Sequence, residues 1–284
     1  MDNEISTIEN TAESHIGTLL LKTGKLKAND VERISALQKQ NGLLFGEAAK
    51  ALGLVSDDDI NRALAHQFHY NVLSPDDETL SKELVAAYEP FSSEVETLRT
   101  IREQIKLHSG QQHKVLAVVS AERGEGRSWL VANLGIVFAQ LGQRTLIVDA
   151  DLRQPRQQEY FKIKQQYGLS DILAKRAEYS IIKTIAGFDN LSVLIAGTIV
   201  PNPLELLSQE LKNYLDQCQN HYDIILVDTP SVEQAIDAEI IAQKSGAILL
   251  LAKLHQTKLT KLKLVKDAIQ ETGVDCLGAI ITDF

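Results

Sequence analysis

The sequence predicts an α/β protein, in which a doubly wound, mainly parallel sheet follows a small α-helical domain. Two observations support this class. From Val115 onward, continuous apolar runs alternate with amphipathic stretches, as expected for parallel strands that are buried on both faces. Before that point, the sequence shows a helical repeat. The runs expected to form strands are VLAVVS (115–120), TLIVDA (145–150), LSVLIA (191–196), IILVDT (224–229), AILLLA (247–252) and CLGAII (276–281).

The composition limits the classes of function. The 284 residues are 44% hydrophobic and 24% charged, which is enough for a large core. A net charge of -9 and a pI near 5.3 disfavour binding to nucleic-acid phosphates. The two cysteines, Cys218 and Cys276, lie in apolar contexts and are expected to be reduced thiols of a cytosolic protein. The polar start and the short apolar runs predict no signal peptide and no membrane span.

The front of the chain contains a duplication. Residues 16–38 align with residues 45–67 without a gap, so that Gly17 falls on Gly46 and Gly24 on Gly53. Each unit is expected to form a short helix, a glycine turn and a second helix, with Asn29 and Ser56 as caps. We therefore expect a helical domain over residues 1–78, a linker over 79–90 and the α/β domain over 91–284.

The duplicated unit resembles the N-terminal domain of type II secretion ATPases. Some relatives of that domain bind cyclic di-GMP through a repeated Arg-Leu-Gly start. The matching triplets here are His15-Ile16-Gly17 and Leu44-Phe45-Gly46, which lack the arginine. This difference favours protein docking as the role of the helical domain, with cyclic di-GMP binding as the alternative.

The stretch SAERGEGRS, residues 120–128, has the pattern of a phosphate-binding loop between a strand and a helix. Its two glycines let backbone N–H groups approach phosphate oxygens, and the helix that follows offers its positive end. Ser128 is the hydroxyl expected on magnesium. The residues expected around the phosphates are Glu122, Arg123, Gly124, Glu125, Gly126, Arg127, Ser128 and Trp129.

Arg127 occupies the position at which this type of loop usually has a lysine. A guanidinium keeps the positive charge and can hold a phosphate through two bonds, but it is larger and planar. Phosphoryl transfer depends on positioning and electrostatics. We therefore expect nucleotide binding to tolerate this exchange better than catalysis does.

Three acidic residues follow two of the expected strands. Asp149 and Asp151 end the run TLIVDAD, and Asp228 ends the run IILVD. In an extended chain, two carboxylates with one residue between them point to the same side. A carboxylate at the end of a buried strand commonly holds magnesium through water. The three acids therefore predict a magnesium site beside the loop.

These motifs together resemble the bacterial tyrosine kinases of exopolysaccharide synthesis, whose fold is that of P-loop NTPases. The specific mark is four hydrophobic positions leading into Asp-x-Asp-x-Arg, here Leu146 to Arg153, together with a Pro-Asn-Pro stretch in residues 197–207. With the helical front, the whole chain resembles the chain-length-determinant kinases of the EpsG type. In that group an arginine in the loop is typical.

The resemblance implies ATP and Mg²⁺ as ligands and a tyrosine hydroxyl as acceptor. It implies that Arg127 holds phosphates, that Ser128 and Asp151 hold the metal, and that Asp228 supports a metal-bound water. Asp149 is the candidate base, because a phenol must lose its proton during attack.

The resemblance also implies assembly. The family joins subunits into a ring through a Glu-Arg-Arg helix pattern, here Glu96, Arg99 and Arg102; a solvated salt-bridging face is the alternative. It implies a separate chain-length-determinant membrane protein as partner, and hence a peripheral location at the inner membrane. Since Tyr222 is the last tyrosine of the chain, we expect no phosphorylation of a tyrosine-rich tail.

Two other functions stay open from the sequence. The first is an ATP-binding regulatory subunit with little kinase activity. The second is a partitioning-type ATPase, although Ala121, Glu122 and Arg123 stand where that class carries a signature lysine.

Overall fold

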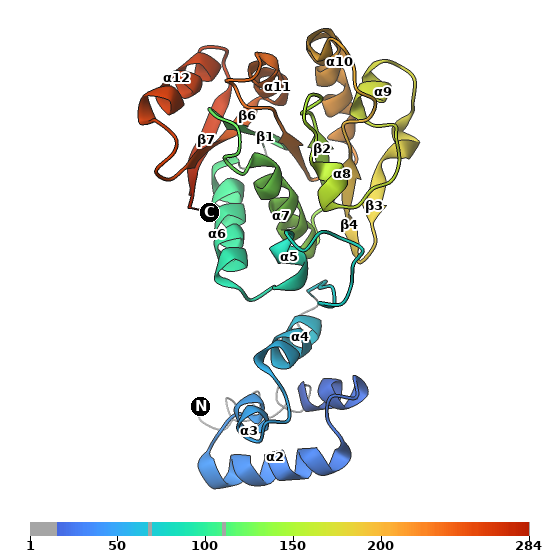
Figure 1. Cartoon of the computed structure of the whole chain (residues 1–284), viewed down its shortest axis with the longest axis vertical. Coiled ribbons are helices and arrows are strands. Elements are labelled where there is room, and N and C mark those ends of the chain that lie inside the picture. Colours follow the sequence, from blue (N-terminus) through green and yellow to red (C-terminus); the bar gives the residue numbers. More distant parts are fainter. Residues whose placement is uncertain (1–15, 68–69, 110–111, 284) are drawn as a thin grey trace. The chain divides into compact units, whose positions relative to one another are not determined.

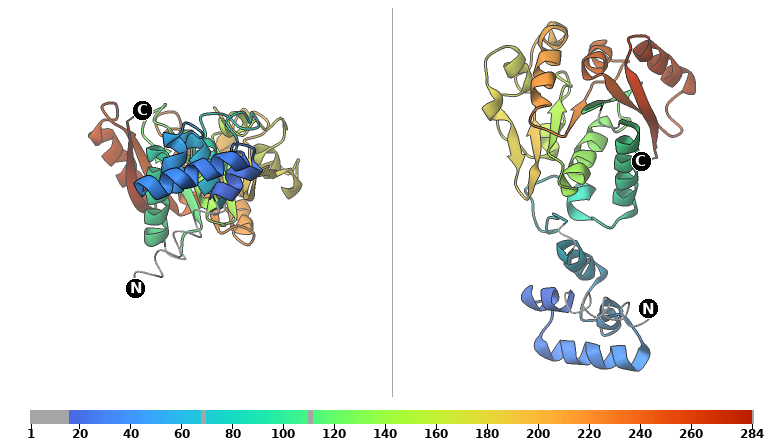
Figure 2. Two further views of the ribbon diagram at one scale, coloured as in Figure 1. Left: turned by 90° about the horizontal axis from the view of Figure 1, so that it is seen from below. Right: turned by 180° about the vertical axis from the view of Figure 1, so that it is seen from behind.

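The computed structural model describes residues 16–67, 70–109 and 112–283, and it divides the chain into two compact units, Met1–Val72 and Leu73–Phe284. Each unit is described by itself. Within the described residues, no helix combines the length and the apolar character that crossing a bilayer requires. Figures 1 and 2 show the elements of both units.

The first unit is helical and keeps the symmetry of the repeat. A helix over residues 16–22 corresponds to α3 (Phe45–Ala51), and α2 (Ala28–Asn41) corresponds to α4 (Asp57–Gln67). Gly24 and Gly53 both adopt a positive φ, as the sequence match predicts. The core of the unit contains Leu20, Leu26, Ile34, Phe45, Ala48, Ala49, Val55 and Ala63.

The helix caps confirm one expectation and correct another. Ser56 caps α4, because its Oγ accepts the N–H of Asp59 at 3.2 Å. Asn29 lies inside α2, and the cap there is the carboxylate of Asp30, which accepts the N–H of Lys27 at 2.9 Å. The glycine of the second triplet, Gly46, has a structural reason as well. A Cβ at this position would come within 3.2 Å of Ile60, so the glycine permits close helix packing. His15 lies outside the described residues.

The second unit contains a seven-stranded sheet of order β3-β4-β2-β5-β1-β6-β7, in which every adjacent pair is parallel except β3 with β4. This confirms the predicted doubly wound, mainly parallel fold. The six expected strands are present, and β3 is an addition that the sequence did not reveal. The strands are β1 (Val115–Ser120), β2 (Thr145–Asp149), β3 (Lys183–Ile185), β4 (Phe188–Leu194), β5 (Ile224–Asp228), β6 (Ala247–Lys253) and β7 (Asp275–Thr282).

Helices cover both faces of the sheet, with α6 and α7 on one face and α10, α11 and α12 on the other (Figures 1 and 2). Alternate residues of β1 enter the two cores: Leu116 packs with the first layer and Ala117 with the second. The helices of this unit are α5 (Val85–Tyr88), α6 (Ser93–Ser109), α7 (Arg127–Gln140), α8 (Gln157–Tyr160), α9 (Leu169–Leu173), α10 (Pro203–Cys218), α11 (Asp237–Ser245) and α12 (Leu259–Gln270).

The segment expected to be a linker, residues 79–90, is part of the second unit instead. Leu84 and Ala86 have no exposed surface and lie in the core beneath α7. The indole N–H of Trp129 donates to the carbonyl of Glu83 at 2.8 Å, and Asn133 accepts the N–H of Ala86 at 3.0 Å. These bonds from α7 explain the difference, because they replace the water contacts that a linker would make.

Gly168, just before α9, provides a test of packing beside the end of β4. A Cβ at this residue would lie 2.1 Å from the carbonyl oxygen of Ile195 and 2.5 Å from the amide of Gly197, and backbone atoms cannot move aside cheaply. We expect Gly168→Ala to lower the free energy of unfolding by about 2–3 kcal/mol in urea denaturation. Gly278→Ala is the control, because nothing lies within 4 Å of its added Cβ. A loss of stability equal to that of the control would contradict this account.

Candidate active site

The three motif segments meet at one edge of the sheet because they follow the carboxyl ends of neighbouring strands. The loop over residues 120–128 follows β1, the Asp-x-Asp motif ends β2, and Asp228 ends β5, which lies between them. In the β2–β5 register, Asp149 stands directly opposite Asp228. In an open α/β sheet, this edge is where ligands bind.

A cavity of about 570 Å³ opens at this edge. The loop contributes Ser128 and the start of α7, and the Asp-x-Asp motif contributes Asp151. The remaining walls come from the packed segment before α6, from the first turn of α6, from the region of α8 and from the segment after β5. The lining residues are Glu83, Glu94, Arg123, Gly124, Gly126, Arg127, Ser128, Trp129, Asp151, Gln154, Arg156, Tyr160 and Gln234.

The glycines of the loop are required by its backbone. Gly124 and Gly126 have φ values of 77° and 96°, in the left-handed region, where a side chain would be strained. Gly126 then caps α7, and its carbonyl accepts the N–H of Leu130 at 2.9 Å. The loop therefore ends at the N-terminus of a 14-residue helix, as a phosphate-binding loop requires.

Arg127 is buried and is anchored to the protein. Its Nε donates to the carbonyl of Thr229 at 2.8 Å, and its Nη1 donates to the carbonyl of Glu122 at 2.9 Å and to the hydroxyl of Ser120. Burial lowers the pKa of this guanidinium, while the charges of Asp228 and Asp151 oppose the drop. Arg127 thus links the ends of β1 and β5, a role that its place in the sequence did not indicate.

Glu125 and Glu122 lie behind the cavity and fix the loop from outside. The Glu125 carboxylate accepts the N–H of Glu122 at 2.8 Å and the hydroxyl of Thr257. Thr282, at the end of β7, donates to the Glu125 carbonyl at 3.2 Å. The Glu122 carboxylate pairs with Lys261 at 2.8 Å. Both acids were expected to surround phosphates. In the structure their side chains hold the loop to α12 and the segment before it, and the Glu125 carbonyl links the loop to β7.

The acidic residues differ in their access to the cavity. Asp151 lines the wall, and its Oδ1 accepts the N–H of Gln154 at 2.9 Å. Asp149 has no exposed surface, and its Oδ2 accepts the N–H groups of Arg156 and Gln157 at 3.1 and 3.0 Å. Asp149 therefore shapes the turn into α8, while Asp151 is placed to contact a ligand.

Burial raises the pKa of both strand-end carboxyls. The pKa of Asp228 is raised to about 6 by its complete burial, although a bond from Gln157 opposes the rise. The pKa of Asp149 is raised well above its ordinary value by burial, and the charge of Asp228 adds to the effect. Because both carboxyls are buried and face each other, a positive charge at this edge would stabilise their ionised forms.

The side chains at this edge fit magnesium bound through phosphate and water. Asp228 Oδ1 is buried and has no hydrogen-bond partner among the described residues. This is unusual, because a carboxylate oxygen is a strong hydrogen-bond acceptor. Among those residues, no three acidic, histidine or cysteine side chains converge as direct ligands of a metal. Magnesium keeps several of its waters and usually takes one or two carboxylates plus phosphate oxygens, so this arrangement fits. Ser128 and Asp151 would hold such an ion from the cavity wall, and Asp228 would act through water.

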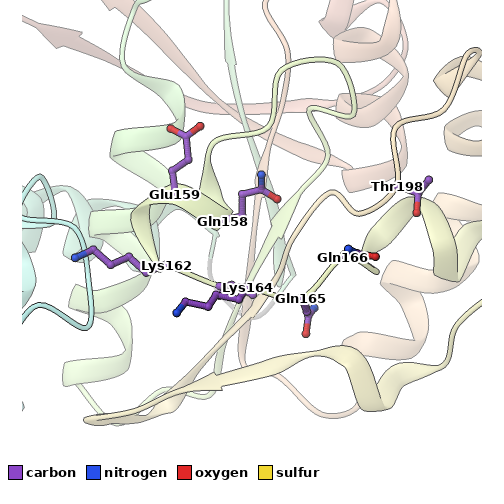
Figure 3. A pocket seen from close by; sticks show the side chains of 8 residues that line it. Gln158, Glu159, Lys162, Lys164, Gln165, Gln166 and Thr198 are labelled. Atoms are coloured by element: carbon purple, nitrogen blue, oxygen red, sulfur yellow. The ribbon is translucent and has the colours of Figure 1, made fainter.

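A second hollow of about 740 Å³ lies beside α8 and contains none of the predicted site residues (Figure 3). Its walls come mainly from the segment that connects α8 to α9. The lining residues are Gln158, Glu159, Lys162, Ile163, Lys164, Gln165, Gln166 and Thr198.

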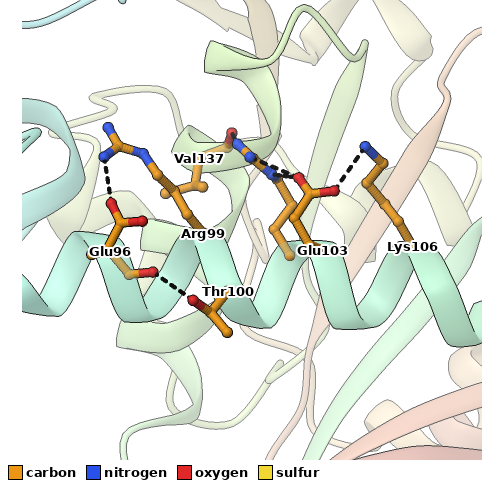
Figure 4. Close-up of polar contacts among 7 residues, drawn as sticks. Glu96, Arg99, Thr100, Glu103, Lys106 and Val137 are labelled. Atoms are coloured by element: carbon orange, nitrogen blue, oxygen red, sulfur yellow. Dashed lines mark hydrogen bonds and ion pairs between the residues drawn. The ribbon is translucent and has the colours of Figure 1, made fainter.

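The predicted interface residues of α6 make contacts within the unit (Figure 4). Arg102 is buried and donates to the carbonyl of Val137 at 3.0 Å, besides pairing with Glu103 at 2.8 Å. Arg99 pairs with Glu96 at 3.1 Å, and the Glu96 side chain is 71% exposed. Of the three predicted residues, Glu96 is therefore the one that the structure presents to solvent.

Sequence reasoning missed several residues of the cavity and its support: Glu83, Glu94, Gln154, Arg156, Gln157, Tyr160 and Gln234. Burial raises the pKa of Tyr160 to about 12. The run of polar residues directly after Asp151 was the available signal for Gln154, Arg156 and Gln157. The acids of residues 83 and 94 carried no signal, because they reach the cavity through tertiary packing.

A strand-end loop with left-handed glycines, a helix directly after it and facing acids on the neighbouring strands defines a P-loop nucleotide-binding domain. The AAA domain family model matches residues 113–271. The tyrosine-protein kinase YwqD of Bacillus subtilis is 33% identical over 204 residues, which cover 71% of this chain and 86% of that protein.

Solved structures agree with this match. The kinase domain of the Escherichia coli tyrosine kinase ETK superposes with a TM-score of 0.67 and 27% identity, covering 70% of this chain and 79% of that one. The chimerical protein CapA2B2 gives a TM-score of 0.68 with 28% identity, covering 78% and 98% of the two chains. The chain belongs to the family of bacterial tyrosine kinases, which confirms the predicted enzyme class.

The anchoring role of Arg127 can be tested by restoring the usual residue of such loops. In Arg127→Lys, a single ammonium cannot reach Thr229, Ser120 and Glu122 together, so we expect the free energy of unfolding to fall by about 1–3 kcal/mol. Urea denaturation without nucleotide measures this change. Arg123→Lys is the matched control, since Arg123 is exposed in the same loop. Equal stability of the two variants would refute the anchoring role.

The raised pKa of Asp228 predicts a pH-dependent effect of Asp228→Asn. The folded chain binds a proton here more strongly than the unfolded chain does, so stability falls as the pH rises from about 4 to about 6. Because asparagine carries no charge, we expect this variant in EDTA to exceed the parent in stability by up to about 3 kcal/mol near neutral pH, with the gain vanishing near about pH 4. Thermal and urea unfolding at several pH values measure this gain. A gain that does not change with pH would exclude the buried charge as its cause, and the exposed Asp189→Asn serves as control.

Proposed function

We propose that this chain transfers the γ-phosphate of ATP to tyrosine hydroxyls of proteins and thereby regulates the length and export of an exopolysaccharide. The observation that carries the proposal is the convergence of the loop, Ser128 and Asp151 on one cavity, in a chain whose relatives include named tyrosine kinases. The finer parts, a chain-length-determinant membrane protein as partner and a peripheral location at the inner membrane, rest on the family resemblance.

The residues of the cavity divide the work of the reaction. The amides of Gly124 and Gly126 and the start of α7 receive the phosphates, and Arg127 adds positive charge. The Nε and Nη1 of Arg127 hold protein atoms, while Nη2 carries no hydrogen bond to the described residues. A planar guanidinium can therefore hold all three acceptors and still offer a donor to a phosphate, whereas the single nitrogen of a lysine could not reach the three acceptors together.

Magnesium, when bound, would neutralise charge that develops on the transferred group. Ser128 and Asp151 are the side chains placed to hold it, and Asp228 would accept from its waters. Asp149 is the proposed base, and its raised pKa suits that task. If Asp149 keeps its bonds from the backbone N–H groups of Arg156 and Gln157, Asp151, which lines the cavity, would accept the phenol proton instead.

We propose further that subunits associate through the face of α6 that presents Glu96.

The duplicated helical unit would dock a protein partner, with cyclic di-GMP as the alternative ligand. A regulatory subunit with little kinase activity is the second candidate function. It is favoured because the three protein acceptors engage two nitrogens of Arg127 and leave only Nη2 for a phosphate.

The test is phosphotyrosine formation by the purified chain with Mg²⁺-ATP and a synthetic polymer of glutamate and tyrosine, read by mass spectrometry. Asp149→Asn and Asp151→Asn should each reduce the rate at least about 100-fold, because removing a base or a metal contact costs that much. Asp189→Asn, on the exposed side of β4, should keep the parent's rate. Tight ATP binding with no labelled tyrosine would support the regulatory subunit and reject the kinase.

A further inference from the structure

Gln157 connects the three segments that meet at the candidate site: the start of α7, the end of β2 and the end of β5. This residue opens α8 and has no exposed surface. Its side-chain Nε2 donates to the carbonyl of Ser128 at 3.0 Å and to Asp228 Oδ2 at 2.8 Å. Its backbone N–H donates to Asp149 Oδ2 at 3.0 Å. One residue therefore connects the helix after the loop with the acids that end β2 and β5.

The orientation of the Gln157 amide follows from its neighbours. The Ser128 carbonyl and the Asp228 carboxylate both accept hydrogen bonds, so the amide nitrogen must face them and the oxygen must face away. Gln157 Oε1 is buried and has no hydrogen-bond partner among the described residues. Asp228 Oδ1 is also buried and has no hydrogen-bond partner among those residues, although the Ser128 side chain is near enough to the Asp228 carboxyl to lower its pKa. The hydrogen-bonded side chains of Gln157 and Asp228 thus each have one buried acceptor oxygen without a donor.

Buried acceptors without donors are costly, and they are rare outside sites that bind a water or a ligand. A second carboxylate or a carbonyl cannot satisfy them, because both oxygens need donors. A hydrated magnesium ion supplies donors through its waters, and it also offsets the charge of Asp149 and Asp228. The polarity of the two unsatisfied oxygens therefore matches the metal proposed for this edge.

We infer that Gln157 is a positioning residue for the magnesium–nucleotide complex. It fixes Asp228 and Ser128 relative to each other, and this leaves Asp228 Oδ1 as an acceptor for water on the metal. This inference rests on the proposed function, since it assumes that nucleotide binds here with magnesium. It assigns a role to a residue that lies outside the loop and outside the Asp-x-Asp motif.

The experiment compares ADP affinity with Mg²⁺ and with EDTA, measured by calorimetry on the full chain. In Gln157→Met, which keeps the length of the side chain and removes its polar atoms, the gain in affinity from magnesium should shrink by about tenfold or more. The affinity in EDTA should stay within about threefold of the parent, because the loop itself is unchanged. Thermal unfolding in EDTA shows whether the variant is folded, and Gln157→Asn, too short to bridge both acceptors, should give the same loss.

Gln158→Met is the matched control. Gln158 is the next residue of α8, and it lines the second hollow rather than the nucleotide cavity (Figure 3). This variant should keep the parent's full magnesium gain.

Three results would overturn the assignment in different ways. A full magnesium gain in Gln157→Met would reject the positioning role alone. An equal loss of ADP affinity with Mg²⁺ and with EDTA would show a purely structural role. The absence of a magnesium gain in the parent would reject the metal of the proposed function, and the role of Gln157 with it.

Discussion

The sheet edge that carries the candidate site depends on the burial of two carboxyl groups that face each other across adjacent strands. Asp149 and Asp228 are register partners, and neither has exposed surface. Such a pair is tolerated where hydrogen bonds and a neighbouring cation offset its charge. Backbone N–H groups serve Asp149, Gln157 serves one oxygen of Asp228, and the anchored guanidinium of Arg127 lies nearby. The folding of this edge thus leaves a local excess of negative charge, which a divalent cation would balance.

The sheet could be predicted from the sequence because its strands are buried on both faces and hence continuously apolar. The strand β3 and the helix α9 escaped prediction, since a three-residue edge strand and a five-residue helix leave too short a pattern. The segment over residues 79–90 looked like a linker because it lies in a polar stretch, residues 73–91, that carries Pro75 and Pro90. Its burial is decided by side chains of α7, such as Trp129 and Asn133, which lie far along the chain.

The candidate site shows the same division. Strand-end positions could be placed together from the sequence, because parallel strands end at a common edge. Ser128 and Asp151 line the cavity at this edge, and Asp228 ends β5, which lies between β1 and β2. The sequence could not predict the direction in which a side chain of the site points. Whether Glu125 turns toward a phosphate or toward Thr257 depends on contacts over a separation of 132 residues. The same holds for Arg127, which reaches the carbonyl of Thr229.

The hydrogen bond between the loop over residues 120–128 and β7 has a consequence for how the chain folds during its synthesis. Glu125 and Thr282 are 157 residues apart, yet they share a hydrogen bond. A nascent chain that has emerged only as far as β5 would already contain the loop and all three acids, but it would lack this brace. A ligand that binds the braced loop more tightly than the unbraced loop would accordingly favour chains whose sheet is complete.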